Sequence, residues 1–235
     1  MTLPVAILAG GPAMRLRPIT ETIPKAMVQV AGRPFLFHQL DWLRKEGVKQ
    51  VVLCVGHLGE QIRAAVGDGA SFGIAVEYSF DGNRLLGTGG ALKKALPKLG
   101  DAFFVLYGDT YLRCSFAEVE RAFRSAGKPA LITVLKNDGR WDRSNVLFSQ
   151  ERLLRYDKRN PSNAMQHIDY GLSVLRAYIF DRYGEDEVFD LGDTLKTLSN
   201  GDELAGFEVT DRFYEIGSPV GLIEAEKFLS RKGKQ

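Results

Sequence analysis

The amino-acid sequence predicts an α/β protein in which helices cover both faces of a mixed, mostly parallel β-sheet, giving three layers. Short and wholly apolar runs, such as residues 5–9 and 103–107, have the length and composition of strands that are buried on both faces. Segments with helical spacing alternate with these runs up to residue 135, as they do where helices join parallel strands. Because 45% of the 235 residues are hydrophobic, one large core is expected, and we predict a single domain over residues 1–235.

The first half of the chain, residues 1–135, supplies the parallel part of this sheet. Apolar residues at 36, 40 and 43 predict a helix that begins at Pro34 and ends at Gly47. Ser115 and Glu118 form a capping box, which predicts a helix from there to Gly127. The same patterns predict the other elements, which are strands at 48–55, 74–78 and 130–135 and helices at 58–66 and 91–96.

The second half, residues 136–235, has a different rhythm. Strands are predicted at 145–148, 153–156 and 168–175, and the first two are too close together for a helix to join them. These strands are therefore expected to be antiparallel additions to the sheet. Helices are predicted at 177–183 and 191–198, and a last helix begins at Pro219 and ends among the final lysines.

Composition and charge exclude several classes of protein. Lys and Arg number 31 against 29 Asp and Glu, and a net charge of +2 predicts no attraction to nucleic acid. No run of 18 apolar residues predicts a membrane span, and the first residues do not form a signal peptide. Cys54 and Cys114 make neither a disulfide framework nor a metal motif. We therefore expect a protein of the cytoplasm.

The strongest functional pattern follows the first strand. Small residues after a buried strand, here Gly10 and Gly11, let backbone N–H groups approach phosphate closely. Arg15 and Lys25 can neutralise a polyphosphate. The alternative interpretation is a glycine turn followed by solvated basic residues, which would have the same local sequence without binding phosphate. The dinucleotide motif G-x-G-x-x-G and the Walker motif G-x-x-x-x-G-K-[ST] are both absent, which excludes the two commonest phosphate loops.

Asp109 is the best candidate for a metal ligand. It follows the apolar strand at 103–107 and Gly108, and Mg²⁺ is usually bound by one or two carboxylates together with substrate phosphates. An aspartate in a turn after a strand is the alternative interpretation.

Six segments, in order along the chain, resemble those of the sugar-1-phosphate nucleotidyltransferases, also called NDP-sugar pyrophosphorylases. The first, L-A-G-G-P-A-M-R-L-R-P at 8–18 followed by P-K at 24–25, resembles the family pattern L-A-G-G-x-G-T-R-L-x-P…P-K. The others are L-G-T-G-G-A at 86–91, L-Y-G-D at 106–109, D-K at 157–158, D-Y-G at 169–171 and Y-E-I-G-S-P at 214–219. Together they span residues 8 to 219, nearly the whole chain. The form L-G-T-G-G and the short length are most similar to the guanylyltransferases for heptose and mannose 1-phosphates.

The resemblance implies a Rossmann-like nucleotidyltransferase fold and a set of site residues. Residues 1–135 would bind nucleotide through Leu8, Ala9, Gly10, Gly11, Arg15, Lys25, Thr88, Gly89 and Gly108. Residues 136–235 would bind the sugar phosphate through Asp157, Lys158, Asp169 and Gly171. Asp109 and Glu215 would hold Mg²⁺, and Arg15, Lys25 and Asp109 would be catalytic.

The implied reaction joins a nucleoside triphosphate to a sugar 1-phosphate and releases pyrophosphate, with GTP and a heptose or mannose 1-phosphate as the expected pair. The repulsion between the two anions is the first barrier, and Mg²⁺ with Arg and Lys clamps removes it. Five residues depart from the family pattern: Ala13 for Gly, Met14 for Thr, Asp157 for Glu, Asp169 for Asn and Glu215 for Asp.

These departures keep other interpretations open. One is a uridylyltransferase, or another nucleotidyltransferase acting on a different sugar or on an alcohol phosphate such as phosphocholine. A second is a catalytically silent protein that binds a nucleotide sugar and regulates a partner. Members of the family are often dimers or tetramers, and the sequence is compatible with a homo-oligomer without fixing its number of subunits.

Overall fold

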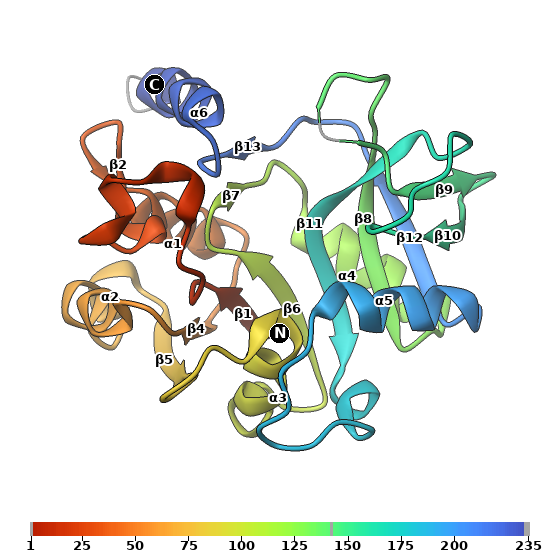
Figure 1. Cartoon of the computed structure of the whole chain (residues 1–235), viewed down its shortest axis with the longest axis horizontal. Coiled ribbons are helices and arrows are strands. Elements are labelled where there is room, and N and C mark those ends of the chain that lie inside the picture. Colours follow the sequence, from red (N-terminus) through yellow and green to blue (C-terminus); the bar gives the residue numbers. More distant parts are fainter. Residues whose placement is uncertain (1, 142, 233–235) are drawn as a thin grey trace.

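The structure is a computed structural model that describes residues 2–141 and 143–232. Its central sheet has nine strands (Figure 1). β1 (Val5–Leu8) lies between β4 (Gln50–Val55) and β6 (Ala102–Tyr107), and β5 (Ala75–Phe80) pairs with the outer side of β4. All four strands are parallel, as the sequence predicts for this half. Their carboxyl ends therefore meet at one edge of the sheet.

The second half of the sheet is built around β11 (His167–Arg176). This strand is antiparallel to both β6 and β8 (Ala130–Lys136), and it separates them. β12 (Leu204–Val209) runs parallel to β8, while β9 (Val146–Ser149) and β10 (Arg152–Tyr156) form an antiparallel pair. The mixed, mostly parallel sheet with antiparallel additions is thus confirmed. β8, however, does not join the parallel strands directly, because β11 takes the place beside β6.

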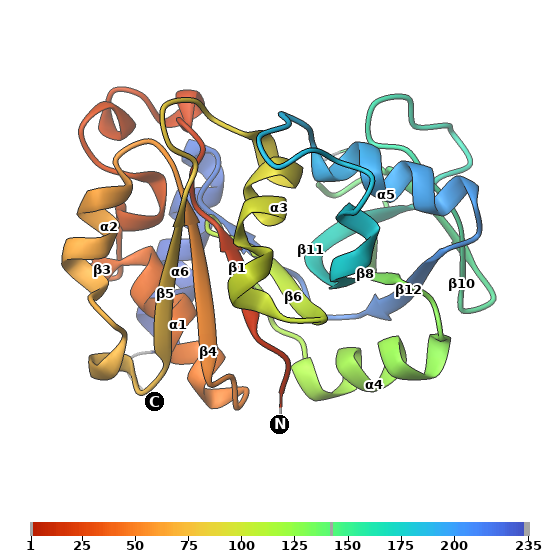
Figure 2. The same ribbon diagram turned by 90° about the horizontal axis from the view of Figure 1, so that it is seen from below.

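Helices cover both faces of the sheet, which confirms the three layers (Figure 2). Side chains alternate between the faces, so that Val5 and Ile7 of β1 enter one core cluster and Ala6 enters the other. The first cluster includes residues of α1 (Phe35–Lys45), α2 (Gly59–Val66), α4 (Phe116–Ala126) and α6 (Pro219–Lys232). The second includes residues of α3 (Gly87–Leu99) and α5 (Leu191–Asn200).

Helix ends follow the sequence signals in several places. The Ser115 hydroxyl accepts a hydrogen bond from the Glu118 N–H at 3.3 Å, which confirms the predicted cap of α4. α3 begins four residues earlier than the predicted start at residue 91, so Gly89 and Gly90 belong to its first turn. The helix predicted at 177–183 is wrong, because only the 3₁₀ turn Ala177–Phe180 forms there.

The remaining elements are short. The strands β2 (Gln29–Val30), β3 (Arg33–Pro34), β7 (Thr110–Tyr111) and β13 (Tyr214–Glu215) were not predicted, nor was β12. Further 3₁₀ turns lie at Met14–Leu16, Ile19–Glu21, Lys25–Met27 and Ala70–Phe72. Within the described ranges, no helix is long and apolar enough to cross a membrane.

Candidate active site

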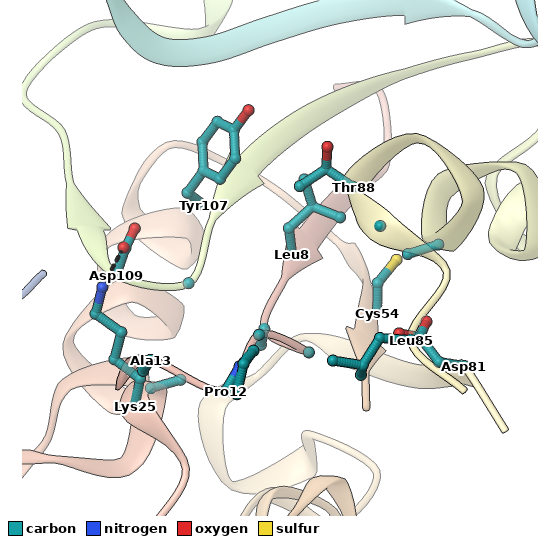
Figure 3. Close-up of a pocket in the computed structure, with 17 residues that line it drawn as sticks. Leu8, Pro12, Ala13, Lys25, Cys54, Asp81, Leu85, Thr88, Tyr107 and Asp109 are labelled. Carbon is teal, nitrogen blue, oxygen red and sulfur yellow. Dashed lines mark hydrogen bonds and ion pairs between the residues drawn. The ribbon is translucent and has the colours of Figure 1, made fainter. Parts of the chain in front are cut away.

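A cavity of about 320 Å³ lies where the carboxyl ends of β1, β4 and β6 meet the start of α3 (Figure 3). Most of the residues predicted to bind nucleotide line it, namely Leu8, Ala9, Gly10, Gly11, Lys25, Thr88 and Gly108, and so does Asp109, the predicted metal ligand. Arg15 and Gly89 are not among the lining residues. Figure 3 shows Lys25 and Asp109 at one end of the cavity, and Cys54, Leu85 and Asp81 at the other.

The loop after β1 is held close to the neighbouring strand. The Ala9 N–H donates to the Cys54 carbonyl at 2.9 Å, and a side chain at Gly10 would lie 3.0 Å from the backbone nitrogen of Gly56. At Gly11 nothing lies within 4 Å of the position of a side chain, so its backbone borders open space. These two glycines therefore bring backbone, and not side chains, to the cavity, as a phosphate-binding loop requires.

Ala13 adopts the left-handed conformation that the family pattern assigns to glycine. Its φ of 48° is uncommon for a residue with a Cβ atom. The Ala13 carbonyl accepts hydrogen bonds from the Thr20 hydroxyl at 2.8 Å and from the Leu16 N–H at 3.2 Å. The chain thus keeps the turn with alanine, because neighbouring residues fix its backbone.

At the polar end of the cavity, Lys25 and Asp109 form an ion pair. The Lys25 ammonium lies 2.6 Å from Asp109 Oδ2, and the Thr110 hydroxyl donates to Oδ1 at 3.0 Å. Asp109 lies in the turn between β6 and β7, and Lys25 begins a 3₁₀ turn. Both side chains are partly exposed, at 16% for Lys25 and 31% for Asp109, so this pair is open to a ligand.

Glu215 lies beside this pair because β13 pairs with β7. Glu215 is opposite Thr110, and the Ile216 N–H donates to the Asp109 carbonyl at 2.9 Å. The Glu215 carboxylate accepts a hydrogen bond from the Ser218 hydroxyl at 2.6 Å and one from the Gly217 N–H.

Gly217 explains how Arg15 joins the same cluster. A Cβ atom there would lie 2.5 Å from Glu215 Oε2, 3.0 Å from Lys25 Nζ and 3.5 Å from Arg15 Nη2. Glycine leaves room for the ends of these three charged side chains to gather at one point. The fold therefore brings together four of the predicted catalytic and metal-binding residues, from segments up to 200 positions apart: Arg15, Lys25, Asp109 and Glu215.

The donor set of this cluster fits Mg²⁺. Mg²⁺ is usually bound by one or two carboxylates, with substrate phosphates and water as its other ligands. Asp109, directly before β7, and Glu215, on the paired strand β13, supply two carboxylates. No group of three or more His, Cys, Asp or Glu residues suited to a metal occurs within residues 2–141 and 143–232. The arrangement thus suits a metal that arrives with a phosphate ligand better than one held by protein groups alone.

The opposite end of the cavity contains residues that the sequence analysis did not assign to a site. Leu85 and Cys54 are apolar walls, and burial raises the pKa of the Cys54 thiol to about 12, so it is neutral and not a nucleophile at physiological pH. Asp81 is 7% exposed and accepts a hydrogen bond from the Leu86 N–H at 3.3 Å. It follows β5 directly, but β5 is only partly buried and its predicted range ends at residue 78, so the sequence signal here is weaker than the one at Asp109.

The glycines of the L-G-T-G-G segment contact another part of the protein. The N–H groups of Gly89 and Gly90 both donate to the Phe189 carbonyl, at 3.0 and 3.4 Å. A Cβ atom at Gly89 would overlap the Phe189 ring. Thr88, in contrast, lines the cavity while its hydroxyl accepts from the Leu191 N–H at 2.8 Å. The nucleotide-binding role of Gly89 remains a prediction, and its visible role is to let residues 187–191 pack on α3.

The residues predicted to bind the sugar phosphate lie near Tyr107, which borders the cavity. The Lys158 ammonium is 6.0 Å from the centre of the Tyr107 ring. Asp169 accepts from the Gly171 N–H at 3.0 Å and from the Tyr156 hydroxyl at 3.4 Å, and burial raises its pKa. A break in the pairing of β11 with β8 falls between residues 169 and 173, at Gly171, whose φ is +99°.

The carboxylate of Asp157 is buried and is bound by groups of the protein itself. The Asp157 side chain is 1% exposed, and its carboxylate is 2.8 Å from the Lys196 ammonium and 2.9 Å from the Asn160 N–H. Together these contacts fix the turn that carries Lys158. Direct binding of sugar by Asp157 remains a prediction that rests on the family resemblance.

The Asp157–Lys196 pair predicts a specific loss of stability in acid. The hydrogen bond from Lys196 lowers the pKa of Asp157 from 3.8 to about 2. A carboxyl whose pKa is lower in the folded state stabilises the protein above pH 3.8, and that contribution is lost as the pH falls toward 2. Lys196→Met should therefore have a lower urea midpoint than the wild type at pH 6. The difference between the two midpoints should be smaller at pH 3.

The control for this prediction is Arg63→Met, which removes the exposed Arg63–Glu60 pair. That variant should keep the wild-type urea midpoint at both pH values within error, because exposed pairs contribute little. If Lys196→Met lowers the urea midpoint by the same amount at pH 6 and pH 3, the lysine acts through packing alone.

The fold and the site define a class of protein: an α/β protein whose ligand cavity lies at the carboxyl ends of parallel strands and is equipped for phosphate groups. The model of the nucleotidyl transferase family matches residues 5–142, more than half of the chain, and the chain belongs to that family.

Relatives cover different shares of the chain. UTP–glucose-1-phosphate uridylyltransferase of Synechocystis is 37% identical over 137 residues, which are 54% of this chain and 35% of that protein. The chain thus spans about a third of the length of the first curated relatives it matches. N-acetylmuramate alpha-1-phosphate uridylyltransferase of Neisseria meningitidis is 28% identical over 94% of this chain and 95% of its own. The solved structure of HddC from Yersinia pseudotuberculosis complexed with GMP-PN has a TM-score of 0.77 at 25% identity, covering 97% and 99% of the two chains.

Proposed function

We propose that the protein is a sugar-1-phosphate nucleotidyltransferase, which converts a nucleoside triphosphate and a sugar 1-phosphate into an NDP-sugar and pyrophosphate. The observation that carries this proposal is the cluster of Arg15, Lys25, Asp109 and Glu215 at one end of a cavity lined by a glycine loop. Family membership and the named activities of the relatives support it.

In the proposed reaction, an oxygen of the sugar phosphate attacks the α-phosphorus in line, and the bond to pyrophosphate breaks. Arg15 and Lys25 neutralise the triphosphate and the leaving pyrophosphate, while the backbone at Gly10 and Gly11 holds phosphate oxygens. Asp109 and Glu215 would hold Mg²⁺. When bound, this ion offsets the repulsion between the two anionic substrates. No protein nucleophile is needed, and catalysis rests on positioning and electrostatics.

The two halves of the chain would divide the substrates in a single domain. Residues 1–135 contribute the cavity wall for the nucleotide, and residues 136–235 contribute Lys158, Asp169 and Gly171 on the sugar side. Tyr107 lies between these groups, because it borders the cavity and lies beneath Lys158. GTP with a heptose or mannose 1-phosphate is the proposed pair. The L-G-T-G-G segment and the similarity to a protein solved with GMP-PN support guanine.

The test is pyrophosphate release with Mg²⁺, each of GTP, UTP, CTP, ATP and dTTP, and a panel of mannose, glucose and heptose 1-phosphates. Release is expected with GTP and one of the mannose or heptose substrates. Release confined to UTP would keep the reaction and reject guanine. If folded protein binds an NDP-sugar but releases no pyrophosphate with any pair, the silent regulator replaces the enzyme.

A further inference from the structure

We propose that Asp81 selects the base of the nucleotide, and that its carboxylate accepts hydrogen bonds from the adjacent N1–H and N2–H donors of guanine. This inference rests on the proposed function to the extent that the cavity binds a nucleotide.

The position of Asp81 is fixed by its backbone. The Asp81 N–H donates to the Val55 carbonyl at 2.9 Å, which continues the pairing of β5 with β4 by one residue. The Asp81 carbonyl accepts from the Lys94 ammonium of α3 at 3.1 Å. These bonds fix the backbone from which the carboxylate projects, and the bond from the Leu86 N–H to Oδ2 orients the carboxylate itself, so it can discriminate between ligands.

The side chain of Asp81 is buried at the cavity wall, and the nearest ammonium, that of Lys94, contacts the backbone carbonyl of Asp81 and not its carboxylate. Asp81 is 7% exposed, and the described part of the chain contains no ion pair to its carboxylate. The Leu86 N–H donates to Oδ2 at 3.3 Å, and no hydrogen bond to Oδ1 occurs among residues 2–141 and 143–232. Oδ1 is not one of the fully buried polar atoms of the described residues, and because Asp81 lines the cavity, this oxygen is available to accept a hydrogen bond from a ligand there.

Two glycines leave room for this carboxylate beside the phosphate loop. A Cβ atom at Gly56 would lie 3.1 Å from Asp81 Oδ2, and one at Gly10 would lie 3.5 Å from it. Leu85 and Cys54 provide apolar surface next to Asp81, suited to the face of a base ring. In Figure 3 these residues lie at the far end of the cavity from Lys25 and Asp109, as expected when phosphates occupy one end and the base the other.

The chemistry of the bases decides which one fits. An ionised carboxylate only accepts hydrogen bonds. Guanine presents two neighbouring donors, N1–H and N2–H. The single N3–H of uracil and thymine is flanked by carbonyl oxygens that would repel the carboxylate, and the amino groups of cytosine and adenine adjoin a ring nitrogen that is itself an acceptor. A carboxylate therefore favours guanine over the other four bases.

The experiment measures binding, so that it does not depend on turnover. Calorimetry with Mg²⁺ and each of GDP, UDP, CDP and ADP should show at least tenfold tighter binding of GDP to the wild type. Asp81→Asn should weaken GDP binding by about 10- to 100-fold, as expected for a bidentate contact to a base, and should change UDP binding less than threefold. Asp101→Asn, the same change at an exposed site outside the cavity, should leave both unchanged.

The outcomes separate this inference from the proposed reaction. Preferential binding of GDP that depends on Asp81, without pyrophosphate release from any substrate pair, would reject the reaction and support Asp81. Pyrophosphate release with equal or tighter binding of UDP would support the reaction and overturn the role of Asp81. The wild-type panel also serves as the test if Asp81→Asn does not fold.

Discussion

Asp109→Asn is expected to lower kcat for pyrophosphate release by about 10³-fold, the scale seen when one preorganised electrostatic group is removed from an active site. The amide keeps the size of the side chain but loses the charge that pairs with Lys25 at 2.6 Å and that would hold Mg²⁺ beside Glu215. Asp109→Ala should have at least the same effect. The measurement is the initial rate at saturating GTP and sugar 1-phosphate over a range of Mg²⁺ concentrations.

Asp101→Asn is the matched control, because the same chemical change is then made at an exposed residue outside the cavity. The urea midpoint of Asp109→Asn should stay close to that of the wild type, since Asp109 is partly exposed and lies in a turn. A rate within tenfold of the wild type would remove Asp109 from the mechanism.

Gly89→Ala is expected to lower the free energy of unfolding by about 1–3 kcal/mol, the usual cost of forcing extra volume into a packed site. The new methyl group would overlap the Phe189 ring, and the Phe189 backbone is held in place because its carbonyl accepts hydrogen bonds from the N–H groups of Gly89 and Gly90. Residues 187–191 would have to move away from α3. Since Thr88 lines the cavity and bonds to Leu191, the KM for nucleotide should rise as well.

Gly184→Ala is the control for this substitution. A side chain there would contact only Glu187 atoms, at 3.9 Å, so its effect on stability should stay within about 0.5 kcal/mol. Urea unfolding of both variants measures the difference. If Gly89→Ala is as stable as Gly184→Ala, the contact with Phe189 is not what requires glycine at this position.

The parallel half of the fold could be predicted because its signals are local. Apolar runs, a capping box and terminal glycines lie within a few residues of the elements they define, as at Ser115 for α4. The place of β11 between β6 and β8 could not be predicted in this way, because strand order depends on pairing between distant segments. β12 was missed because it contains Gly206, a residue that weakens strands. A Cβ atom there would lie 2.9 Å from the Phe148 ring, which explains the glycine.

The candidate site shows the same division. Gly10, Gly11 and Asp109 were found because each follows an apolar strand directly. Asp81 was missed because the strand predicted at 74–78 alternates and ends three residues before it, and because no family motif includes it. The association of Gly89 with Phe189 was beyond local patterns, since the two residues are 100 positions apart. For Asp157, the motif gives a sugar-binding role that stays a prediction, while the contact with Lys196 could not be predicted because it depends on the packing of α5 on β10.

The break in the pairing of β11 divides this strand into residues before 171, near the cavity, and residues 172–176, in the middle of the sheet. Residues 172–176 pair with β6, and residues 173–175 also pair with β8, so this part of β11 joins the two halves of the sheet. At residues 169–171 the shape of the chain is set by a local bond from the Gly171 N–H to the Asp169 side chain. Tyr170 is 1% exposed and belongs to the core, whereas the Asp169 side chain is only partly buried. Substitution at Asp169 can therefore change the surface beside Tyr107 while the pairing of residues 172–176 with β6 is kept. The fold thus separates a side chain at the edge of the cavity from the strand pairs that hold the sheet together.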